Sequence, residues 1–382
     1  MPLWPVIAVL LTFGLVIFLH EFGHFLVCVR LCIRVERFSF CFGPELLGMT
    51  RGQTRYSICA VPLGGYVKPA GESLEDVTGQ PDEYFSRSPW HRLLIVFAGP
   101  AMNYVLAFFL FFGVIYVRGM PEPSGEPVIG ELAADFPAKK AGLEPRDRVV
   151  KVNGVDVSTW QDMASFIHRN PGKKVELTFL RDGKPAKTQV VPQLDKDTGR
   201  GLIGIMPEIR YSRISVLRAA REGAGQCWYW TNYTIQTLAE KIYRREKPDL
   251  AGPVGIVQMV TRAARSGLED LVFLIGLISL AIGFFNILPI PLLDGGHAVL
   301  YVYEALSRRK LTVKLMAAAN SVGLVLLVSL LIFATYNDVL RIRDGRRLKA
   351  ELEGLAAPPA ARGLVPSTGT HGIALTTPAT AN

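Results

Sequence analysis

Four long apolar runs interrupt this sequence, at approximately 4–27, 93–117, 271–293 and 316–336. Each is long enough to cross the hydrocarbon core of a bilayer, which takes about 20 helical residues, and none contains Lys or Arg. The chain of 382 residues is 49% hydrophobic, with a mean hydropathy of +0.27. These features predict a multi-pass α-helical membrane protein with about four transmembrane helices and a substantial water-exposed part.

The net charge of +9 has two interpretations. Nucleic-acid binding would need a basic stripe or a base-stacking motif, whereas the basic residues here are spread along the loops. Loops that lie beside anionic lipid explain the excess more simply. Membrane lipid is therefore an expected partner, and nucleic acid is not. The five cysteines are odd in number and form no Cys-x-x-Cys motif, which argues against a disulfide framework.

The basic loops indicate an orientation in the membrane. Segments 28–92 and 294–315 are rich in Lys and Arg, which favours the cytoplasmic side for both. Four spans then place both termini and the long segment 118–270 on the outer side. The five basic residues within 341–349 oppose this orientation, because they would also lie outside.

Residues 127–207 have the pattern of a small α/β domain. Short β-rich runs alternate with turns, residues 160–170 have helical spacing, and Asp182-Gly183 is a typical two-residue hairpin turn. The order of these elements resembles a PDZ domain, with Arg146 where that family usually has Gly. The predicted fold class is therefore a multi-pass α-helical membrane protein with an inserted α/β PDZ-like domain.

Two further segments complete the predicted organisation. Residues 212–250 read as an amphipathic helix, whose clustered Trp and Tyr side chains indicate either a membrane interface or packing against the small domain. Residues 356–382 have a composition typical of disorder. The predicted regions are an N-terminal membrane core at 1–117, a PDZ-like domain at 118–210, an amphipathic helical region at 211–270, a C-terminal membrane core at 271–340, and a basic and then disordered tail at 341–382.

The first apolar run contains the motif His-Glu-x-x-His at residues 20–24. On a helix, His20 and His24 lie about 40° apart around the axis, so both imidazoles can reach one metal ion. Glu21 points roughly 100° away from His20, which suits a general base better than a third ligand. A chance match is the alternative, but three ionisable groups in a span cost several kcal/mol, which a bound metal would offset.

A catalytic zinc site takes three protein ligands and one open position. The best candidate for the third ligand is Asp294, which follows Pro289 and Pro291 and precedes two glycines. Irregular backbone at membrane depth is tolerated where it lines a cavity, so Asp294 is expected beside one. His297 and Glu304 are weaker candidates.

Several separate motifs occur in a recognisable order: HEFGH at 20–24, VPLGGYVK at 61–68, FAGPAMN at 97–103, GPVGI at 252–256 and NILPIPLLDGG at 286–296. Together with one PDZ-like domain they resemble the site-2 protease family (peptidase M50B), and most closely its bacterial branch that cuts anti-sigma factors inside the membrane. The best-known members of that branch have two PDZ domains, whereas this chain has the pattern of one.

The resemblance implies a function and a set of roles. The chain would be an intramembrane zinc metalloendopeptidase of the bacterial inner membrane, cutting single-span proteins such as anti-sigma factors or signal-peptide remnants. His20, His24 and Asp294 would bind Zn²⁺, and Glu21 would activate the water. Residues 61–68 would form a membrane-dipping hairpin that offers a strand edge. The substrate-binding residues would be Asn286, Pro289, Pro291, Gly64 and Gly65.

Other readings stay open at this stage. A metal-ion transporter would need paired repeats, which the sequence lacks, and would give Glu21 no role. A catalytically inactive scaffold with a PDZ-like domain is the other alternative. In a protease, the periplasmic PDZ-like domain would either contact the trimmed C-terminus of a substrate or filter substrates by size. The ligand types would also accept cobalt or manganese, so zinc rests on the resemblance.

Overall fold

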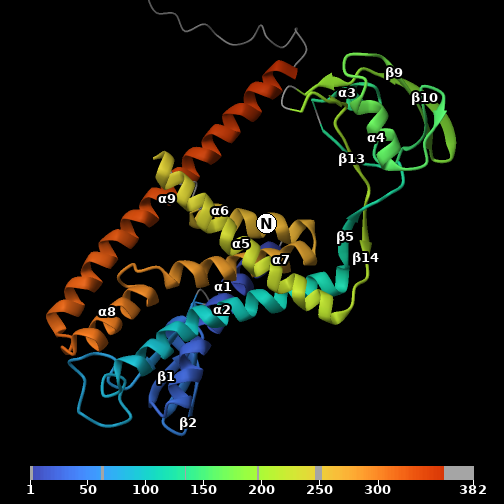
Figure 1. Cartoon of the computed structure of the whole chain (residues 1–382). Coiled ribbons are helices and arrows are strands. Elements are labelled where there is room, and N and C mark those ends of the chain that lie inside the picture. The colour runs from blue at the N-terminus through green and yellow to red at the C-terminus, as the bar shows by residue number, and fades with distance from the viewer. Residues whose placement is uncertain (1–2, 62–63, 134, 196–197, 246–251, 357–382) are drawn as a thin grey trace, which may run out of the picture.

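The computed structural model describes residues 3–61, 64–133, 135–195, 198–245 and 252–356 (Figure 1). Four of the described helices are long and apolar enough to cross a membrane, as predicted: α1 (Leu3–Arg30), α2 (Pro89–Arg118), α7 (Leu268–Ile287) and α9 (Val313–Ala356). The third differs from its predicted range, because α7 ends at Ile287 and not at 293. Leu288 is extended and precedes Pro289, and a residue before proline is disfavoured in a helix.

Helix α2 lies at the centre of the membrane core and packs against α1, α5 (Val216–Arg244), α7 and α8 (Asp294–Ser307). Glycines allow these helices to approach closely, as small residues do in membrane bundles. A Cβ atom on Gly23 of α1 would lie 2.3 Å from the carbonyl oxygen of Ala98 on α2. A Cβ atom on Gly276 of α7 would lie 2.7 Å from the ring of Phe111. The helix-to-helix distances therefore depend on these positions having no side chain.

The segment between α1 and α2 forms a four-stranded sheet. Its strands are β1 (Val35–Ser39), β2 (Phe42–Arg51), β3 (Thr54–Val61) and β4 (Tyr66–Pro69), in the order β2-β3-β1-β4. Strand β1 pairs in parallel with β3 and antiparallel with β4. Strand β4 is therefore an edge strand, at the side of the sheet that contacts α1.

The hairpin predicted for residues 61–68 is wrong, because β3 and β4 do not pair with each other and lie on opposite sides of β1. The two glycines of this segment serve close packing. A Cβ atom on Gly64 would overlap the ring of Phe42, and one on Gly65 would lie 2.7 Å from the carbonyl oxygen of Ser39. The connection can cross β1 because both positions lack side chains.

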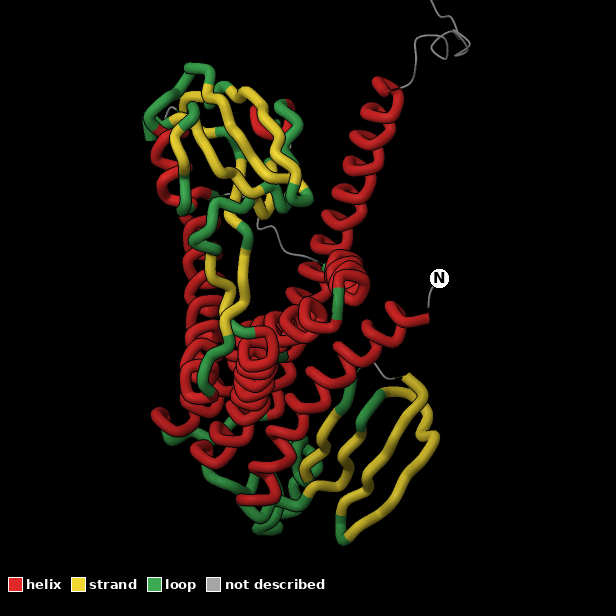
Figure 2. The backbone as a smooth tube through the Cα atoms, turned by 90° about the vertical axis from the view of Figure 1, so that its right-hand side faces the viewer, coloured by secondary structure: helices red, strands yellow, loops and turns green. Residues whose placement is uncertain are grey.

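The PDZ-like domain lies at the opposite end of the helices from this sheet (Figure 2). Its elements are β6 (Ile129–Leu132), α3 (Pro137–Lys140), β7 (Arg148–Val152), β8 (Val155–Asp156), α4 (Trp160–His168), β9 (Val175–Arg181), β10 (Lys184–Val190), β11 (Gln193–Leu194), β12 (Gly201–Leu202) and β13 (Ile205–Pro207). A sheet in the order β10-β9-β7-β8 packs with α4 around one buried apolar cluster.

Local turn chemistry in this domain follows the prediction. Arg181 pairs with Lys184, so Asp182 and Gly183 form the predicted two-residue hairpin turn, and both have positive φ. Arg146 also has a positive φ, of 73°. This conformation favours glycine, which explains why an arginine is unusual at that position.

A two-stranded ribbon joins the PDZ-like domain to the membrane core. Strand β5 (Met120–Pro123) continues from α2, and β14 (Ile209–Ser212) leads into α5 (Val216–Arg244) (Figure 1). The guanidinium carbon of Arg118 lies 4.3 Å from the ring centroid of Tyr211, which ties the end of α2 to this ribbon. The domain thus connects to the helices through two antiparallel strands.

The predicted amphipathic region contains two helices, α5 and α6 (Pro253–Ser266), and α7 already begins at Leu268. The aromatic cluster of α5 is divided. Trp230 packs with α2 and α7, and Trp228 is exposed. These two side chains therefore do not pack against the small domain.

A further helix, α8 (Asp294–Ser307), follows α7. Helix α9 continues past the predicted boundary at 340 to Ala356, and the predicted disordered tail lies outside the described residues from 357 onward.

Candidate metal centre

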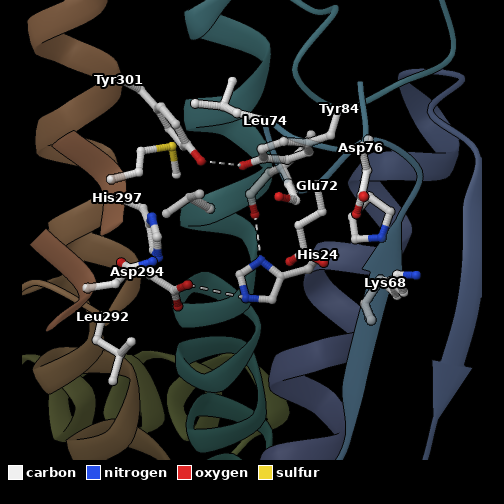
Figure 3. Close-up of a pocket in the computed structure, with 18 of the residues that line it drawn as sticks. His24, Lys68, Glu72, Leu74, Asp76, Tyr84, Leu292, Asp294, His297 and Tyr301 are labelled. Atoms are coloured by element: carbon white, nitrogen blue, oxygen red, sulfur yellow. Dashed lines mark hydrogen bonds and ion pairs between the residues drawn. The ribbon is translucent and has the colours of Figure 1, made fainter. Parts of the chain in front are cut away.

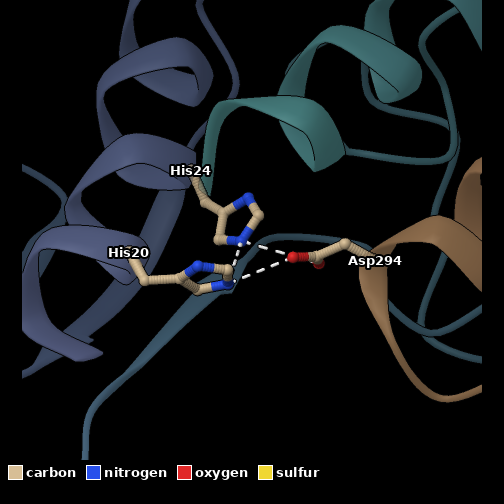
Figure 4. A group of neighbouring side chains, drawn as sticks. All are labelled: His20, His24 and Asp294. Carbon is tan, nitrogen blue, oxygen red and sulfur yellow. Dashed lines mark hydrogen bonds and ion pairs between the residues drawn. The ribbon is translucent and has the colours of Figure 1, made fainter. Parts of the chain in front are cut away.

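The two histidines of the HEFGH motif meet Asp294 in space (Figure 4). The Nε2 atom of His20 lies 3.1 Å from Oδ2 of Asp294, and Nε2 of His24 lies 3.6 Å from Oδ1. The two Nε2 atoms are 3.3 Å apart. One ligand atom from each residue therefore falls within a sphere that a single ion could occupy, since these atoms all lie within 4.8 Å of one another.

The hydrogen bonds around these three side chains leave lone pairs free to bind a cation. Nδ1 of His24 lies 2.7 Å from the carbonyl oxygen of Ile95. A carbonyl oxygen only accepts, so Nδ1 carries the proton, and Nε2 of the neutral ring presents a bare lone pair. That lone pair faces a second imidazole nitrogen and a carboxylate. The buried Oδ2 of Asp294 accepts no hydrogen bond from the described residues. A divalent cation would satisfy all three groups, and two imidazoles with one carboxylate suit zinc.

The loop before α8 places Asp294 at this point. Leu292 adopts a positive φ of 77°, which turns the chain sharply. A Cβ atom on Gly295 would lie 2.2 Å from the carbonyl oxygen of Ile287, and one on Gly296 would lie 2.3 Å from that of Ile290. The two glycines let the first turn of α8 pack directly against the end of α7, which brings Asp294 up to α1.

Helix α2 makes room for the histidines at Gly99. A Cβ atom there would lie 2.2 Å from Nε2 of His24 and 2.9 Å from Nε2 of His20. Any side chain at this position would enter the space that the imidazoles occupy. Gly99 belongs to the FAGPAMN motif, and its steric role beside the metal centre follows from the structure.

A buried ion pair joins α8 to α2, and no local pattern in the sequence indicates it. Nη2 of Arg92 lies 2.9 Å from Oε1 of Glu304. Arg92 is 2% exposed, and its guanidinium carbon lies 4.8 Å from the ring centroids of both Phe85 and Tyr301. This cluster fixes α8, and therefore Asp294, against α2. Glu304, considered as a third ligand, pairs with Arg92 instead.

The other weak ligand candidate, His297, lies one turn after Asp294, where its ring stacks on Tyr301 with centroids 6.3 Å apart. It lines the cavity but does not belong to the metal-binding group. Burial raises the pKa of Tyr301 to about 12, so its hydroxyl stays protonated. This hydroxyl lies 3.2 Å from that of Tyr84, in the segment that leads into α2.

Glu21 is held by the edge strand of the first sheet. Its Oε2 accepts a hydrogen bond from the backbone N–H of Val67 on β4, at 3.2 Å. Gly65 lies nearby, where a Cβ atom would be 3.7 Å from Cγ of Glu21. The N–H groups of an edge strand that point away from its partner are free for other contacts. The free edge of β4 therefore faces the metal centre.

These groups open into a cavity of about 1090 Å³ (Figure 3). His20, Glu21, His24 and Asp294 line it near the metal centre. The remaining walls come from β4, the segment after it, α7, the loop before α8, α8 and α9: Lys68, Glu72, Asp76, Tyr84, Asn286, Leu292, His297, Tyr301 and Asn320. The lining thus combines membrane helices with the polar segment after β4, which gives water a route to the metal centre.

The predicted substrate-binding residues fall into two groups. Asn286, at the end of α7, lines the cavity. Pro289 and Pro291 lie in the loop between α7 and α8, outside the lining residues. Gly64 and Gly65 are buried in the sheet connection and are also outside it. A role in substrate binding stays a prediction for all five.

The model of peptidase family M50 matches residues 8–330. Two bacterial proteins named "putative zinc metalloprotease" are similar over most of their length. The one from Clostridium acetobutylicum is 34% identical over 89% of this chain and 98% of its own, and the one from Mesorhizobium japonicum is 36% identical over 89% and 99%. Among solved structures, the PDZ domain of an SdrC-like protein from Listeria monocytogenes covers 22% of this chain and 90% of its own, at 20% identity and a TM-score of 0.20.

Proposed function

The chain belongs to peptidase family M50, the site-2 protease family that its motifs predicted, and from this premise we propose that it is a zinc-dependent endopeptidase that cuts single-span membrane proteins within their transmembrane segments. The natural substrate would be a membrane-anchored regulator of the anti-sigma-factor kind, or a signal-peptide remnant. The proposal extends the family assignment to a position of cleavage and a class of substrate.

The observation that carries the proposal is the position of the metal-binding group. His20 and His24 lie on a helix that is long and apolar enough to span the bilayer, and Asp294 reaches them from the first turn of α8, after the loop that follows the spanning helix α7. A peptidase site at this depth acts on a bond at the same depth. The cavity beside it supplies the water that hydrolysis needs.

The residues around the site suit peptide hydrolysis. A bound Zn²⁺ would supply a water of lowered pKa and polarise the scissile carbonyl. Glu21 neighbours His20 in sequence and lines the same cavity. Its carboxylate would accept the proton of the attacking water and then donate it to the leaving amine. The hydrogen bond from Val67 orients the carboxylate for this task.

Strand β4 offers a place for the substrate backbone. A transmembrane helix hides its peptide groups in its own hydrogen bonds, so the substrate must unwind before cleavage. An extended segment that pairs with a free strand edge regains those bonds. The edge of β4 lies next to Glu21, so pairing there would present the scissile bond to the general base. The amide of Asn286, across the cavity, would hold the substrate backbone.

We propose an orientation in the bacterial inner membrane with the PDZ-like domain periplasmic. The basic loops around the first sheet and α8 favour the cytoplasmic side. The start of α1 and the end of α2 lie toward the PDZ-like domain. There the indole of Trp4 donates to the carbonyl of Ala264, and Arg118 pairs with Glu269 at the start of α7. The metal centre would then lie in the cytoplasmic half.

Cleavage of a tagged single-span substrate by the purified protein in detergent tests the proposal. Wild type is expected to cut within the span. Glu21→Gln and treatment with a zinc chelator are each expected to abolish cleavage. Glu75→Gln serves as the matched control, because Glu75 lines the same cavity but does not belong to the metal-binding group. It should keep activity within about twofold.

Two results would contradict the proposal. Full activity in Glu21→Gln would remove the general base from the mechanism. Bound zinc with intact substrate, including after deletion of residues 127–207, would favour the catalytically inactive scaffold. If that deletion instead restores cleavage, the PDZ-like domain acts as a filter. Cleavage together with contacts between this domain and a trimmed C-terminus would assign it a binding role.

A further inference from the structure

Asn103 is a fully buried amide in the middle of α2, and the proposed chemistry does not use it. Its Nδ2 atom lies 3.2 Å from Nδ1 of His20. Its Oδ1 atom has no hydrogen-bond partner among the described residues. A buried amide in a spanning helix is costly unless it serves another group. The group that it faces is the ring nitrogen of His20 opposite the metal-facing one.

The Nδ1 atoms of the two histidines, which face away from the metal-binding position, have different hydrogen-bond partners. Nδ1 of His24 donates to the backbone carbonyl of Ile95, which fixes its Nε2 as the ligand atom. To present Nε2 in the same way, His20 must also carry its proton on Nδ1. The amide of Asn103 lies within reach of that nitrogen, so it must turn its oxygen toward His20 to accept this proton. The oxygen and nitrogen of an amide exchange places by a half-turn of the side chain.

Neighbouring contacts fix the position of Asn103 itself. Its backbone carbonyl accepts a hydrogen bond from the hydroxyl of Ser279 on α7, at 2.9 Å. A Cβ atom on Gly283 of α7 would lie 3.1 Å from Cβ of Asn103, so α7 packs closely on this turn. Asn103 therefore lies where α1, α2 and α7 meet, and its side chain has a defined direction toward His20.

We infer that Asn103 is a positioning residue of the metal centre: its amide oxygen accepts the Nδ1 proton of His20 and so holds Nε2 ready for the metal. This inference rests on the proposed zinc site. Partners of this kind set the orientation and basicity of a metal-binding histidine, and their loss typically weakens metal binding 10- to 100-fold. The Asn103 amide oxygen thus holds the proton of His20 on Nδ1, as the Ile95 carbonyl oxygen does for His24.

Zinc affinity, measured by chelator competition on the purified protein in detergent, tests the inference. Asn103→Leu keeps the side-chain size but loses the acceptor, so zinc should bind about 10- to 100-fold more weakly. Asn103→Asp keeps an acceptor and should bind zinc within about tenfold of wild type or more tightly. Ser279→Ala removes the neighbouring hydrogen bond but leaves the amide, so it should weaken zinc binding less than Asn103→Leu does. Thermal unfolding without metal records any purely structural effect.

The outcomes separate this inference from the proposed function. If wild type binds no zinc, both fail. If wild type binds zinc and Asn103→Leu binds it equally well, only the role of Asn103 is overturned. Equal weakening in Asn103→Leu and Ser279→Ala would overturn it too, because that result assigns the effect to helix packing. Should Asn103→Leu fail to fold, a loss of more than tenfold in Asn103→Asp would contradict the inference.

Discussion

Helices α2 and α9 are both long, apolar and able to span a bilayer, yet they differ in what surrounds them. About 44% of the most apolar window of α2 is buried inside the protein, compared with 6% for α9. Helix α2 packs on four other helices and lies directly against His20 and His24. Helix α9 lines one side of the cavity and leaves most of its surface free to face lipid. Hydropathy identifies a span, but packing decides whether it builds the metal centre.

This difference in packing predicts that substitutions on α2 have larger effects than substitutions on α9. Changes on α2 and its partners should disturb the metal centre and the folded state together. Changes on α9 should act locally, through the few side chains that connect it to the rest.

The largest effect is expected at Gly99. In Gly99→Ala, the new methyl group would lie 2.2 Å from Nε2 of His24, so either α2 or the imidazoles must move. We expect zinc binding and peptidase activity to fall by about 100-fold, the upper end of what the loss of groups that orient metal ligands costs. Gly113→Ala is the control on the same helix, because a Cβ atom there meets open space among the described residues. If the two variants bind zinc equally, the close approach of α2 is not required.

The next effect is expected at the ion pair between α2 and α8. Glu304→Gln leaves the guanidinium of Arg92 buried without its counter-charge. Breaking a buried pair by removing one partner costs about 3–5 kcal/mol. We expect a clear drop in unfolding temperature in detergent, together with weaker zinc binding. The double variant Arg92→Met/Glu304→Met should be more stable than Glu304→Gln. An unchanged unfolding temperature in Glu304→Gln would show that the pair does not hold α8.

A smaller, local effect is expected at Asp338 on α9. This buried carboxylate accepts hydrogen bonds from the backbone N–H groups of Gly252 and Gly255, at 3.2 and 2.7 Å, and so caps the start of α6. Its loss in Asp338→Ala should cost about 1–3 kcal/mol. Hydrogen exchange should increase at the start of α6, with zinc affinity unchanged. Val339→Ala, one residue on and exposed, is the control. Weakened zinc binding in Asp338→Ala would contradict the expectation that changes on α9 act locally and leave the metal centre intact.

The smallest effect is expected in the loop that leads into α2. Glu83 accepts hydrogen bonds from the hydroxyl of Thr78 and from the N–H groups of Thr78 and Gly79, and the bond from the Thr78 hydroxyl is the main cause of its lowered pKa. A lowered pKa stabilises the fold above the pKa of the unfolded chain, and this stabilisation is lost as the pH falls through the folded value.

Unfolding temperatures measured from pH 7 to well below pH 4, through the range in which Glu83 takes up its proton, check this expectation. Wild type should lose stability toward the acidic end, and Glu83→Gln should be less stable at pH 7 and show a flatter profile. Glu75→Gln, in the same loop and without these hydrogen bonds, should follow the wild-type curve. A profile in Glu83→Gln as steep as that of wild type would assign the acid sensitivity to other groups.

Features that depend on local sequence were predictable here. The four spans follow from length and hydropathy, and the turn at Asp182-Gly183 follows from residues that tolerate positive φ. The spacing of His20 and His24 predicts that both lie on the same face of α1. Each of these rests on residues close together in the chain, where periodicity and turn chemistry are direct physical signals.

Features that depend on distant pairing were not predictable. The glycines in VPLGGYVK suggested a turn, but β3 and β4 both pair with β1, a choice made by the whole sheet. Arg92 and Glu304 are 212 residues apart, and no local pattern links them. Asp294 was placed near the metal through its broken helix and the family resemblance. Its meeting with α1 depends on the packing of Gly295 and Gly296 against the end of α7.

The central claim is that His20, His24 and Asp294 hold one zinc ion within the membrane core. Zinc X-ray absorption on purified Glu21→Gln, which keeps all three ligands, tests it most directly. We expect one zinc per chain with two imidazole nitrogens at about 2.0–2.1 Å, further oxygen ligands and no sulfur. Zinc should be lost in Asp294→Ala. Sulfur ligands, or full zinc content in Asp294→Ala, would contradict the account.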